Sequence, residues 1–140
     1  MAAAQLYLPP MLALIALSFA MALAILFTRS GELIKGIRPI SYFEDFDGSG
    51  ASVAVMRPTR QLVNLFEFPV LFYTATAILI ALSIQDGPLQ KLFWAYALFR
   101  WLHAISHLLL NRLWIRTPIF ALGNVILLTI WIRICLIVFA

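Results

Sequence analysis

The chain has few charged residues and a single cysteine. Only 11% of its 140 residues are Asp, Glu, Lys or Arg, whereas soluble domains have roughly 25%. Because 64% of the residues are hydrophobic, an ordinary soluble domain is excluded and an integral membrane protein is predicted. Cys135 has no second cysteine to pair with, which excludes an intrachain disulfide and a cysteine metal cluster.

The sequence also lacks basic runs and linkers. Its ten Lys and Arg residues form no run with interleaved aromatic residues, so no nucleic-acid partner is expected. No basic residue precedes the first apolar stretch, which continues to Thr28; both features argue against a cleaved signal peptide. Because no linker divides the sequence, we expect a single domain over residues 1–140.

Four apolar segments are each long enough to cross a bilayer, which takes roughly 20 residues of helix. They predict helices at about 6–28, 61–84, 88–111 and 115–138, with a long inner loop at 29–59. The two later connections are short, so the last three helices should pack as antiparallel neighbours. The expected fold is all-α, an integral membrane bundle of four helices.

Basic residues near the helix ends predict how the bundle is oriented. Lys91 and Arg133 lie toward one end, and a larger group lies toward the other. The positive-inside rule places the larger group inside, and both termini therefore outside. The compact chain, without a recognisable retrieval tail, favours a bacterial inner membrane. The inner group comprises Arg29, Lys35, Arg38, Arg57, Arg60, Arg112 and Arg116.

Two of the predicted helices carry polar residues that are costly inside a bilayer. A charged side chain near the middle is unfavourable by at least about 2.5–3.5 kcal/mol, so it usually has a partner, a polar ligand, a cavity or a subunit interface. At about 100° per residue, each set forms one stripe along its helix. The stripes are Arg60, Asn64 and Glu67 in the second helix, and Arg100, His103, His107 and Asn111 in the third.

The two stripes are expected to face each other. With a rise of about 1.5 Å per residue, Glu67 and His103 both lie roughly 12–14 Å below the inner surface, and Asn64 and His107 lie at roughly 7–8 Å. Glu67 would then pair with Arg100 or His103. Such a basic pocket, with a carboxylate at its base, suits an anionic ligand that bears an amine. The arginines expected around its mouth are Arg60, Arg112 and Arg116.

Two other interpretations of the stripes stay open. Polar residues in membrane proteins often join helices or subunits, at about 0.6–2 kcal/mol per contact. His103 and His107 also have the i, i+4 spacing of a metal or haem pair. No HExxH pattern surrounds these histidines, and we expect no metal site.

The segments RQLVNLFEFPVLFY (60–73) and RWLHAISHLLLNRLWIRTP (100–118) resemble the MAPEG family, the membrane-associated proteins in eicosanoid and glutathione metabolism. The resemblance rests on an Arg-x3-Asn-x2-Glu pattern and an Arg-x2-His stripe, and the length and four-helix layout extend it over most of the chain. It implies a homotrimer of four-helix subunits, with glutathione bound between neighbouring subunits near the cytoplasmic side of the membrane.

The resemblance also implies roles for single residues. Arg116 resembles an arginine that activates the thiol in some members, because a nearby cation favours the nucleophilic thiolate; Arg112 would be the other source of this charge. Arg29 would bind a glutathione carboxylate, and His107 stands where many members have a tyrosine. The positions that line or support the glutathione site correspond to Arg60, Asn64, Glu67, Arg100 and His103.

We therefore expect an enzyme that binds glutathione, or a similar anionic thiol, as a co-substrate in an inward-facing intramembrane pocket. It would conjugate the thiol to a lipophilic electrophile, or reduce that electrophile. The expected partners are the lipid bilayer, further copies of the chain and the lipophilic substrate. The alternative is a non-catalytic membrane protein whose polar stripes serve trimer assembly or lipid-headgroup binding.

Overall fold

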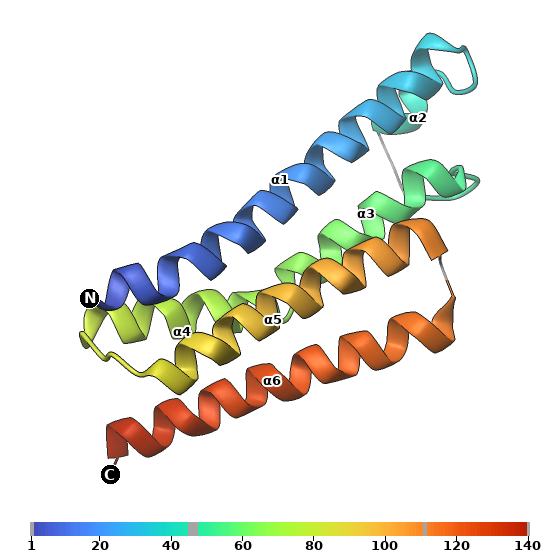
Figure 1. Cartoon of the computed structure of the whole chain (residues 1–140). Helices are drawn as coiled ribbons and strands as arrows, with labels where there is room; N and C mark the ends of the chain where they lie inside the picture. Colours follow the sequence, from blue (N-terminus) through green and yellow to red (C-terminus); the bar gives the residue numbers. More distant parts are fainter. Residues whose placement is uncertain (1, 45–47, 111, 140) are drawn as a thin grey trace.

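The computed structural model describes residues 2–44, 48–110 and 112–139, and within them every regular element is helical. The expected all-α class is confirmed. Long helical rods lie side by side (Figure 1), and a short helix, α2 (Ser41–Glu44), lies in the connection between the first two. The rods are α1 (Ala3–Ile34), α3 (Val53–Phe66) followed by α4 (Pro69–Ala81), α5 (Gly87–Ile105) continued by the π-helix η1 (Ser106–Leu110), and α6 (Leu113–Phe139).

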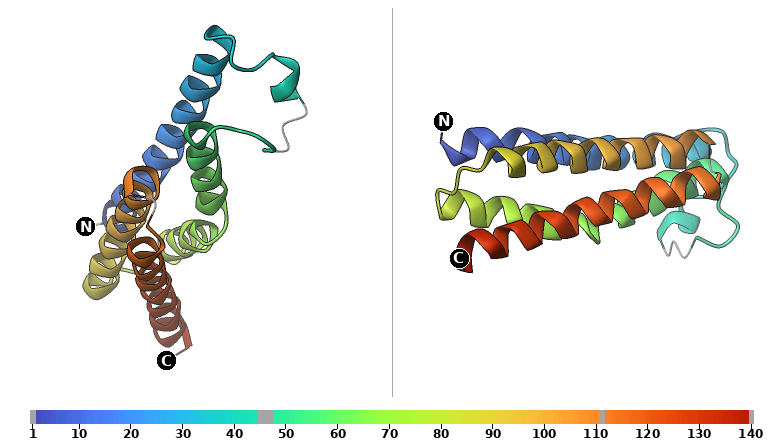
Figure 2. Two further views of the ribbon diagram at one scale, coloured as in Figure 1. Left: turned by 90° about the vertical axis from the view of Figure 1, so that its right-hand side faces the viewer. Right: turned by 60° about the horizontal axis from the view of Figure 1, so that its bottom comes forward.

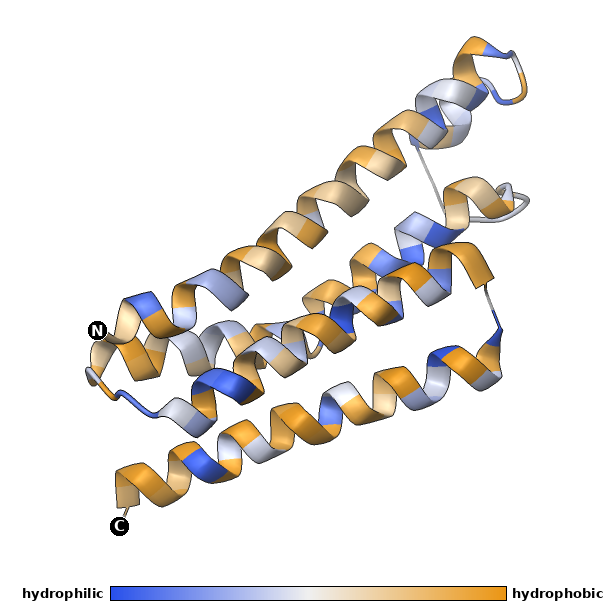
Figure 3. Ribbon diagram, in the orientation of Figure 1, coloured by the Kyte–Doolittle hydropathy of each residue, from blue (hydrophilic) through white to orange (hydrophobic). Residues whose placement is uncertain are grey.

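The described residues contain three helical stretches that are long and apolar enough to cross a membrane: Ala3–Ile34, Val53–Ala81 and Leu113–Phe139. The remaining rod, α5 with η1, packs against α1 and α6. Figure 3 shows apolar residues over most of α1, α4 and α6, whereas hydrophilic residues are more frequent in α3 and α5. Both termini lie at one end of the bundle (Figure 2), which we call the outer end.

The helices extend further at the inner end than the sequence predicts. α1 continues to Ile34 and α3 begins at Val53, so the expected inner loop at 29–59 is wrong at both ends. The N-terminus of α3 is capped by Ser52, whose hydroxyl accepts a hydrogen bond from the Val55 N–H at 3.3 Å. Apolar runs mark only the part of a helix that faces lipid, and polar helical turns outside that part leave no such signal.

The predicted helix at 61–84 is broken rather than continuous. At Glu67 the backbone takes φ −87° and ψ −95°, outside the helical region, and Pro69 begins a new helix near its first position. A proline inside a helix removes one backbone hydrogen bond and clashes with the carbonyl four residues earlier. Where the sequence predicts one continuous helix, the structure therefore has two, α3 and α4.

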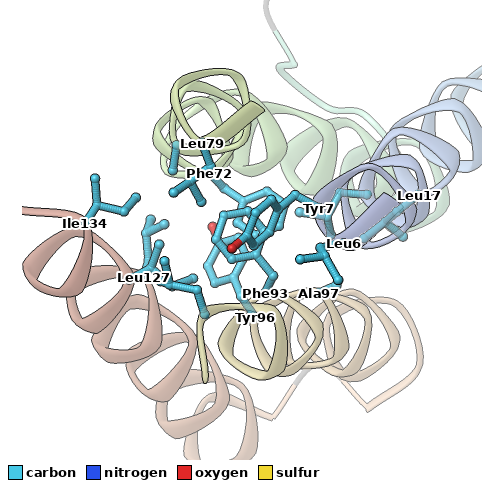
Figure 4. Close-up of a cluster of buried hydrophobic side chains, with 14 of the residues drawn as sticks. Leu6, Tyr7, Leu17, Phe72, Leu79, Phe93, Tyr96, Ala97, Leu127 and Ile134 are labelled. Atoms are coloured by element: carbon cyan, nitrogen blue, oxygen red, sulfur yellow. The ribbon is translucent and has the colours of Figure 1, made fainter. Parts of the chain in front are cut away.

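Four buried aromatic rings form the core of the outer half (Figure 4). Phe72 stacks on Tyr96, with ring centroids 4.8 Å apart, and contacts Phe93 at 4.6 Å. Tyr7 packs on Phe93 at 4.9 Å. Such pairs contribute about 0.5–1.5 kcal/mol each beyond area burial. The cluster joins α1, α4 and α5, and leaves the polar residues of α3 and η1 at the opposite end.

Asp86 joins three helices at the outer end. Its carboxylate caps α5 by accepting from the Leu89 N–H at 2.7 Å, and it receives two hydrogen bonds from Arg133 of α6, at 2.9 and 2.8 Å. The Tyr7 hydroxyl of α1 accepts from the Asp86 N–H at 3.1 Å and donates to its carbonyl at 3.3 Å. The hydrogen bonds from Arg133 lower the pKa of the Asp86 carboxyl.

We expect Asp86→Ala to lower the free energy of unfolding by about 1–3 kcal/mol. This value adds the cost of losing the helix cap to that of losing a partly exposed ion pair. Because the folded pKa of Asp86 is depressed, its contribution is present above the unfolded value of about 3.9 and is lost as the pH falls through the folded value. Thermal unfolding in detergent at pH 7 and pH 3 tests this.

In that experiment, the difference between wild type and variant should shrink at pH 3. Glu44→Gln, at an exposed carboxylate of α2, is the matched control and should change stability little at either pH. If Asp86→Ala lost the same stability relative to wild type at both pH values, the carboxylate charge of Asp86 would contribute nothing to the contacts among α1, α5 and α6.

Candidate functional site

Two adjoining cavities lie at the inner half of the bundle, where α3, the end of α5, η1 and α6 meet. The deep cavity has a volume of about 210 Å³ and is lined by Asn64, His103, Arg116, Thr117 and Phe120. The mouth cavity, of about 300 Å³, is lined by Thr59, Arg60, Val63, Asn64, His107 and Arg116. Asn64 and Arg116 line both, so we treat the two as one polar pocket.

Local helix geometry positions these side chains. Arg60 and Asn64 are one turn apart on α3 and therefore share a face. α5 ends at Ile105, and the wider turn of η1 then carries His107. Arg57 donates from Nη1 to the Leu108 carbonyl at 2.8 Å, which ties the start of α3 to η1 beside the mouth cavity.

Both histidines are buried, with His103 3% and His107 4% exposed. Within the described residues, neither ring nitrogen of His103 makes a hydrogen bond of normal geometry, although the Arg116 backbone lies close enough to interact with the ring, and Nδ1 of His107 has no partner. Buried polar atoms normally have partners, so these nitrogens are suited to a polar ligand or water in the pocket. The two rings are 6.1 Å apart, and no group of three metal-ligating side chains forms in the described part of the chain.

Arg100 lies directly behind the deep cavity and is only 2% exposed. Its Nε donates to the Tyr96 hydroxyl at 3.0 Å, and Nη2 makes a long hydrogen bond of 3.5 Å to the Asn64 carbonyl. The guanidinium also lies 5.3 Å from the centre of the Phe120 ring. The ion pair found among the described residues is that of Asp86 and Arg133, so no carboxylate there balances the Arg100 charge.

The structure brings together most of the residues predicted for the site, but not all. Arg29 lies at the inner part of α1, with its guanidinium 5.6 Å from the Phe43 ring, and Arg112 is exposed just before α6. Neither lines the polar pocket. The predicted stripe member Asn111 lies outside the described residues. The predicted residues that line the pocket are Arg60, Asn64, His103, His107 and Arg116.

The expected pairing of Glu67 with Arg100 or His103 is wrong for the described residues. Glu67 is exposed at the break between α3 and α4 and makes no ion pair there. The prediction assumed that helical periodicity continues from Asn64 to Glu67. Because α3 ends at Phe66, Glu67 leaves the face that Arg60 and Asn64 share.

Some pocket residues escaped the sequence prediction. Thr117 and Phe120 of α6 line the deep cavity, and Thr59 and Val63 line the mouth. The first two belong to α6, a long apolar helix for which the sequence predicts no polar stripe. The sequence does contain a signal for Phe120. This residue lies four positions after Arg116 and therefore shares its face of α6.

An apolar groove adjoins the deep cavity on its outer side. Phe68 and Phe120 meet edge to face, with ring centroids 5.8 Å apart, at the boundary. Beyond them the α4–α6 groove has a volume of about 570 Å³. A polar compartment and an apolar one therefore lie on either side of two rings. The groove is lined by Phe68, Leu71, Asn124, Leu127, Leu128 and Trp131.

Comparison with known proteins adds one finding. The model of the MAPEG family matches residues 7–136, nearly the whole chain and every residue that lines the polar pocket. Searches among curated proteins and among solved structures found no match.

Proposed function

The chain belongs to the MAPEG family of membrane proteins, and on this premise we propose that it binds glutathione, or a similar anionic thiol, in the polar pocket. The thiol is then joined to a lipophilic electrophile that arrives from the bilayer. The observation that carries the proposal is the pocket itself, in which two arginines, an amide and two buried imidazoles converge.

The chemistry of the pocket suits glutathione. Glutathione has two carboxylates, an ammonium group and a thiol, and charge-assisted hydrogen bonds from Arg60 and Arg116 would hold the carboxylates and the thiolate. The ring nitrogens of His103, which make no hydrogen bond of normal geometry in the described part, would supply further donors or acceptors. The buried charge of Arg100, which has no carboxylate partner in the described part, favours any anion placed in the deep cavity.

The α4–α6 groove suits the second substrate. An apolar electrophile partitions into lipid, and this groove leads from the apolar side of the bundle to the rings of Phe68 and Phe120. In an addition reaction, the thiolate sulfur would form a bond to the electrophilic carbon, and a proton equivalent to the one lost by the thiol would return to the adduct. We propose that the reaction takes place beside these two rings.

We also propose that the active protein is a homotrimer in a bacterial inner membrane, with both termini outside. Glu67 is exposed on the single subunit, and a charged side chain near the bilayer middle costs at least about 2.5 kcal/mol when it faces lipid. A neighbouring copy would cover this carboxylate. The inner end, with the mouth cavity, would then face the cytoplasm.

Calorimetric titration of the detergent-purified protein with glutathione tests the binding step, with the oligomeric mass checked by light scattering. We expect saturable binding that Arg60→Ala weakens by about 10–100-fold, because a hydrogen bond to a charged group contributes about 1.5–3 kcal/mol. S-methyl glutathione should still bind, since it keeps both carboxylates. Lys35→Ala, at an exposed basic residue that lines no part of the pocket, should leave the affinity unchanged.

Two results would contradict the proposal. The absence of saturable binding up to millimolar glutathione would leave the family membership in place but remove glutathione as the substrate. An equal loss of affinity in Arg60→Ala and Lys35→Ala would show that the general positive charge of the inner end, and not the pocket, attracts the ligand.

A further inference from the structure

A second groove with charged residues lies at the outer end of the bundle, between α5 and α6 and away from the polar pocket. The α5–α6 groove has a volume of about 530 Å³. Lys91 of α5 and Arg133 of α6 line it together with apolar side chains that include Leu92, Ala95 and Ile132. The proposed glutathione chemistry uses none of these residues.

The two cations of the groove lie near the level of the outer membrane surface. With a rise of about 1.5 Å per residue, Lys91 is about 6 Å along the axis from the start of α5, and Arg133 is about 9 Å from the end of α6. Ala95 and Thr129 lie one turn deeper. The Thr129 hydroxyl donates to the Val125 carbonyl of its own helix at 2.9 Å, so it adds no unused donor to the deeper wall.

The positive charge at this groove is only partly neutralised within the described residues. Arg133 uses Nε and Nη2 to bind Asp86, and that carboxylate offsets one of the two cations. Lys91 is exposed and forms no ion pair in the described part of the chain. The groove thus combines a cationic rim with an apolar interior.

We propose that the α5–α6 groove binds one anionic phospholipid of the outer leaflet. Its phosphate would lie between Lys91 and Arg133, and one acyl chain would run inward past Ala95. A lipid with a net negative charge satisfies both parts of the groove, because charge attracts it to the rim and apolar contact holds its chain. A zwitterionic lipid would bring the positive charge of its own headgroup to the cationic rim, and we expect it to bind more weakly.

The distribution of acidic residues favours a lipid over a second copy of the chain. Asp86 is the single acidic residue between Glu67 and the C-terminus, and it already binds Arg133. The other acidic residues that the structure describes are Glu32, Glu44 and Glu67, and they belong to the inner end or the middle of the bundle. The described side chains of a neighbouring copy would therefore bring no unpaired carboxylate to the outer end to neutralise Lys91.

Native mass spectrometry of the full-length protein tests this proposal, with phosphatidylglycerol and phosphatidylcholine of identical acyl chains supplied in equal amounts. We expect wild type to retain phosphatidylglycerol preferentially and Lys91→Gln to lower that preference about fivefold, the effect of one basic residue near an anionic headgroup. Ala95→Leu, which fills the groove without changing charge, should lower the retention of both lipids.

Matched controls separate the groove from general effects. Lys35→Gln removes an exposed lysine at the inner end, and Ala77→Leu enlarges an exposed alanine of α4 outside the groove. Both variants should retain the two lipids with the preference of wild type. All variants should keep the wild-type unfolding temperature and glutathione affinity, because the groove and the polar pocket share no residue.

Three results would overturn the proposal. The first is equal retention of the two lipids by wild type, and the second is a loss of preference in Lys35→Gln as large as that in Lys91→Gln. The third is displacement of phosphatidylglycerol by millimolar glycerol phosphate, which would show that the rim binds a soluble phosphate ester and that the acyl chain contributes nothing.

Discussion

Replacing Arg116 by alanine is expected to lower glutathione-dependent turnover by about 10²–10³-fold, the usual effect of removing one group that stabilises developing charge. Arg116 lines both cavities of the polar pocket and faces the pocket together with His103 and His107. Its cation would lower the thiol pKa from about 8.5 and so raise the thiolate fraction at neutral pH.

The dependence of rate on pH distinguishes this role from a purely structural one. Without the cation the thiol pKa rises, so the activity of Arg116→Ala should recover partly as the pH is raised from 7 to 9. Initial rates with glutathione and an aryl halide, such as chlorodinitrobenzene, measure this directly. In that reaction the sulfur–carbon bond forms as chloride leaves. Arg116→Lys, which keeps the charge, should retain the wild-type pH profile at a reduced rate.

Arg112→Ala is the matched control, because Arg112 lies four residues away but is exposed and lines neither cavity. We expect its turnover to stay within about threefold of wild type, as for a surface substitution. If Arg112→Ala is as damaging as Arg116→Ala, the charge of the mouth matters and the position of Arg116 does not. If Arg116→Ala dissociates the proposed trimer, the residue serves assembly.

Three of the four predicted membrane helices correspond to the stretches that can cross a membrane, because a bilayer imposes a simple rule, an apolar run of sufficient length. That rule does not describe the helix beyond the apolar run. In the segment from Val53 to Thr59, Arg57 interrupts the apolar run and Pro58 disfavours a helix interior, yet the Ser52 cap and a hydrogen bond from Arg57 to η1 hold the segment in helical form. The first contact depends on cap geometry and the second on tertiary structure, and an apolar run indicates neither.

Helical periodicity predicted that Asn64 would face His103 and His107, and the structure brings these side chains to one pocket. It failed at Glu67 because α3 ends one residue earlier. The contribution of α6 was missed for a different reason. The register of α6 against α3 depends on how the preceding helices α5 and η1 place it, and no pattern within α6 alone reports that register.

Arg100 is the most unusual buried group in the described structure. Its hydrogen bonds go to a neutral hydroxyl and a carbonyl, and two aromatic rings lie near its guanidinium. A buried charge without a counter-ion costs several kcal/mol, and replacing buried ions by apolar residues of similar volume is often neutral or stabilising. A structural role therefore explains Arg100 poorly, whereas an anionic ligand in the adjoining cavity would balance it.

Arg100→Met is accordingly expected to leave the ligand-free protein as stable as wild type, or more so, while weakening glutathione binding about 30-fold. At an effective dielectric constant of about 20, charges about 8 Å apart interact by about 2 kcal/mol, which corresponds to that loss. Unfolding temperatures with and without glutathione, together with calorimetry, measure both quantities on the same samples.

Tyr96→Phe is the informative comparison for Arg100→Met, because it removes the hydroxyl that accepts from Arg100 and keeps the charge. It should lower stability by about 1–3 kcal/mol, the cost of an unsatisfied buried donor, and change affinity less than Arg100→Met does. Arg100→Met could instead unfold the protein or dissociate the proposed trimer while the glutathione affinity of each folded subunit stays unchanged. That result would show that Arg100 joins helices and that the assembly alternative is correct. Opposite changes in stability and affinity can arise only when the arginine is kept for its ligand.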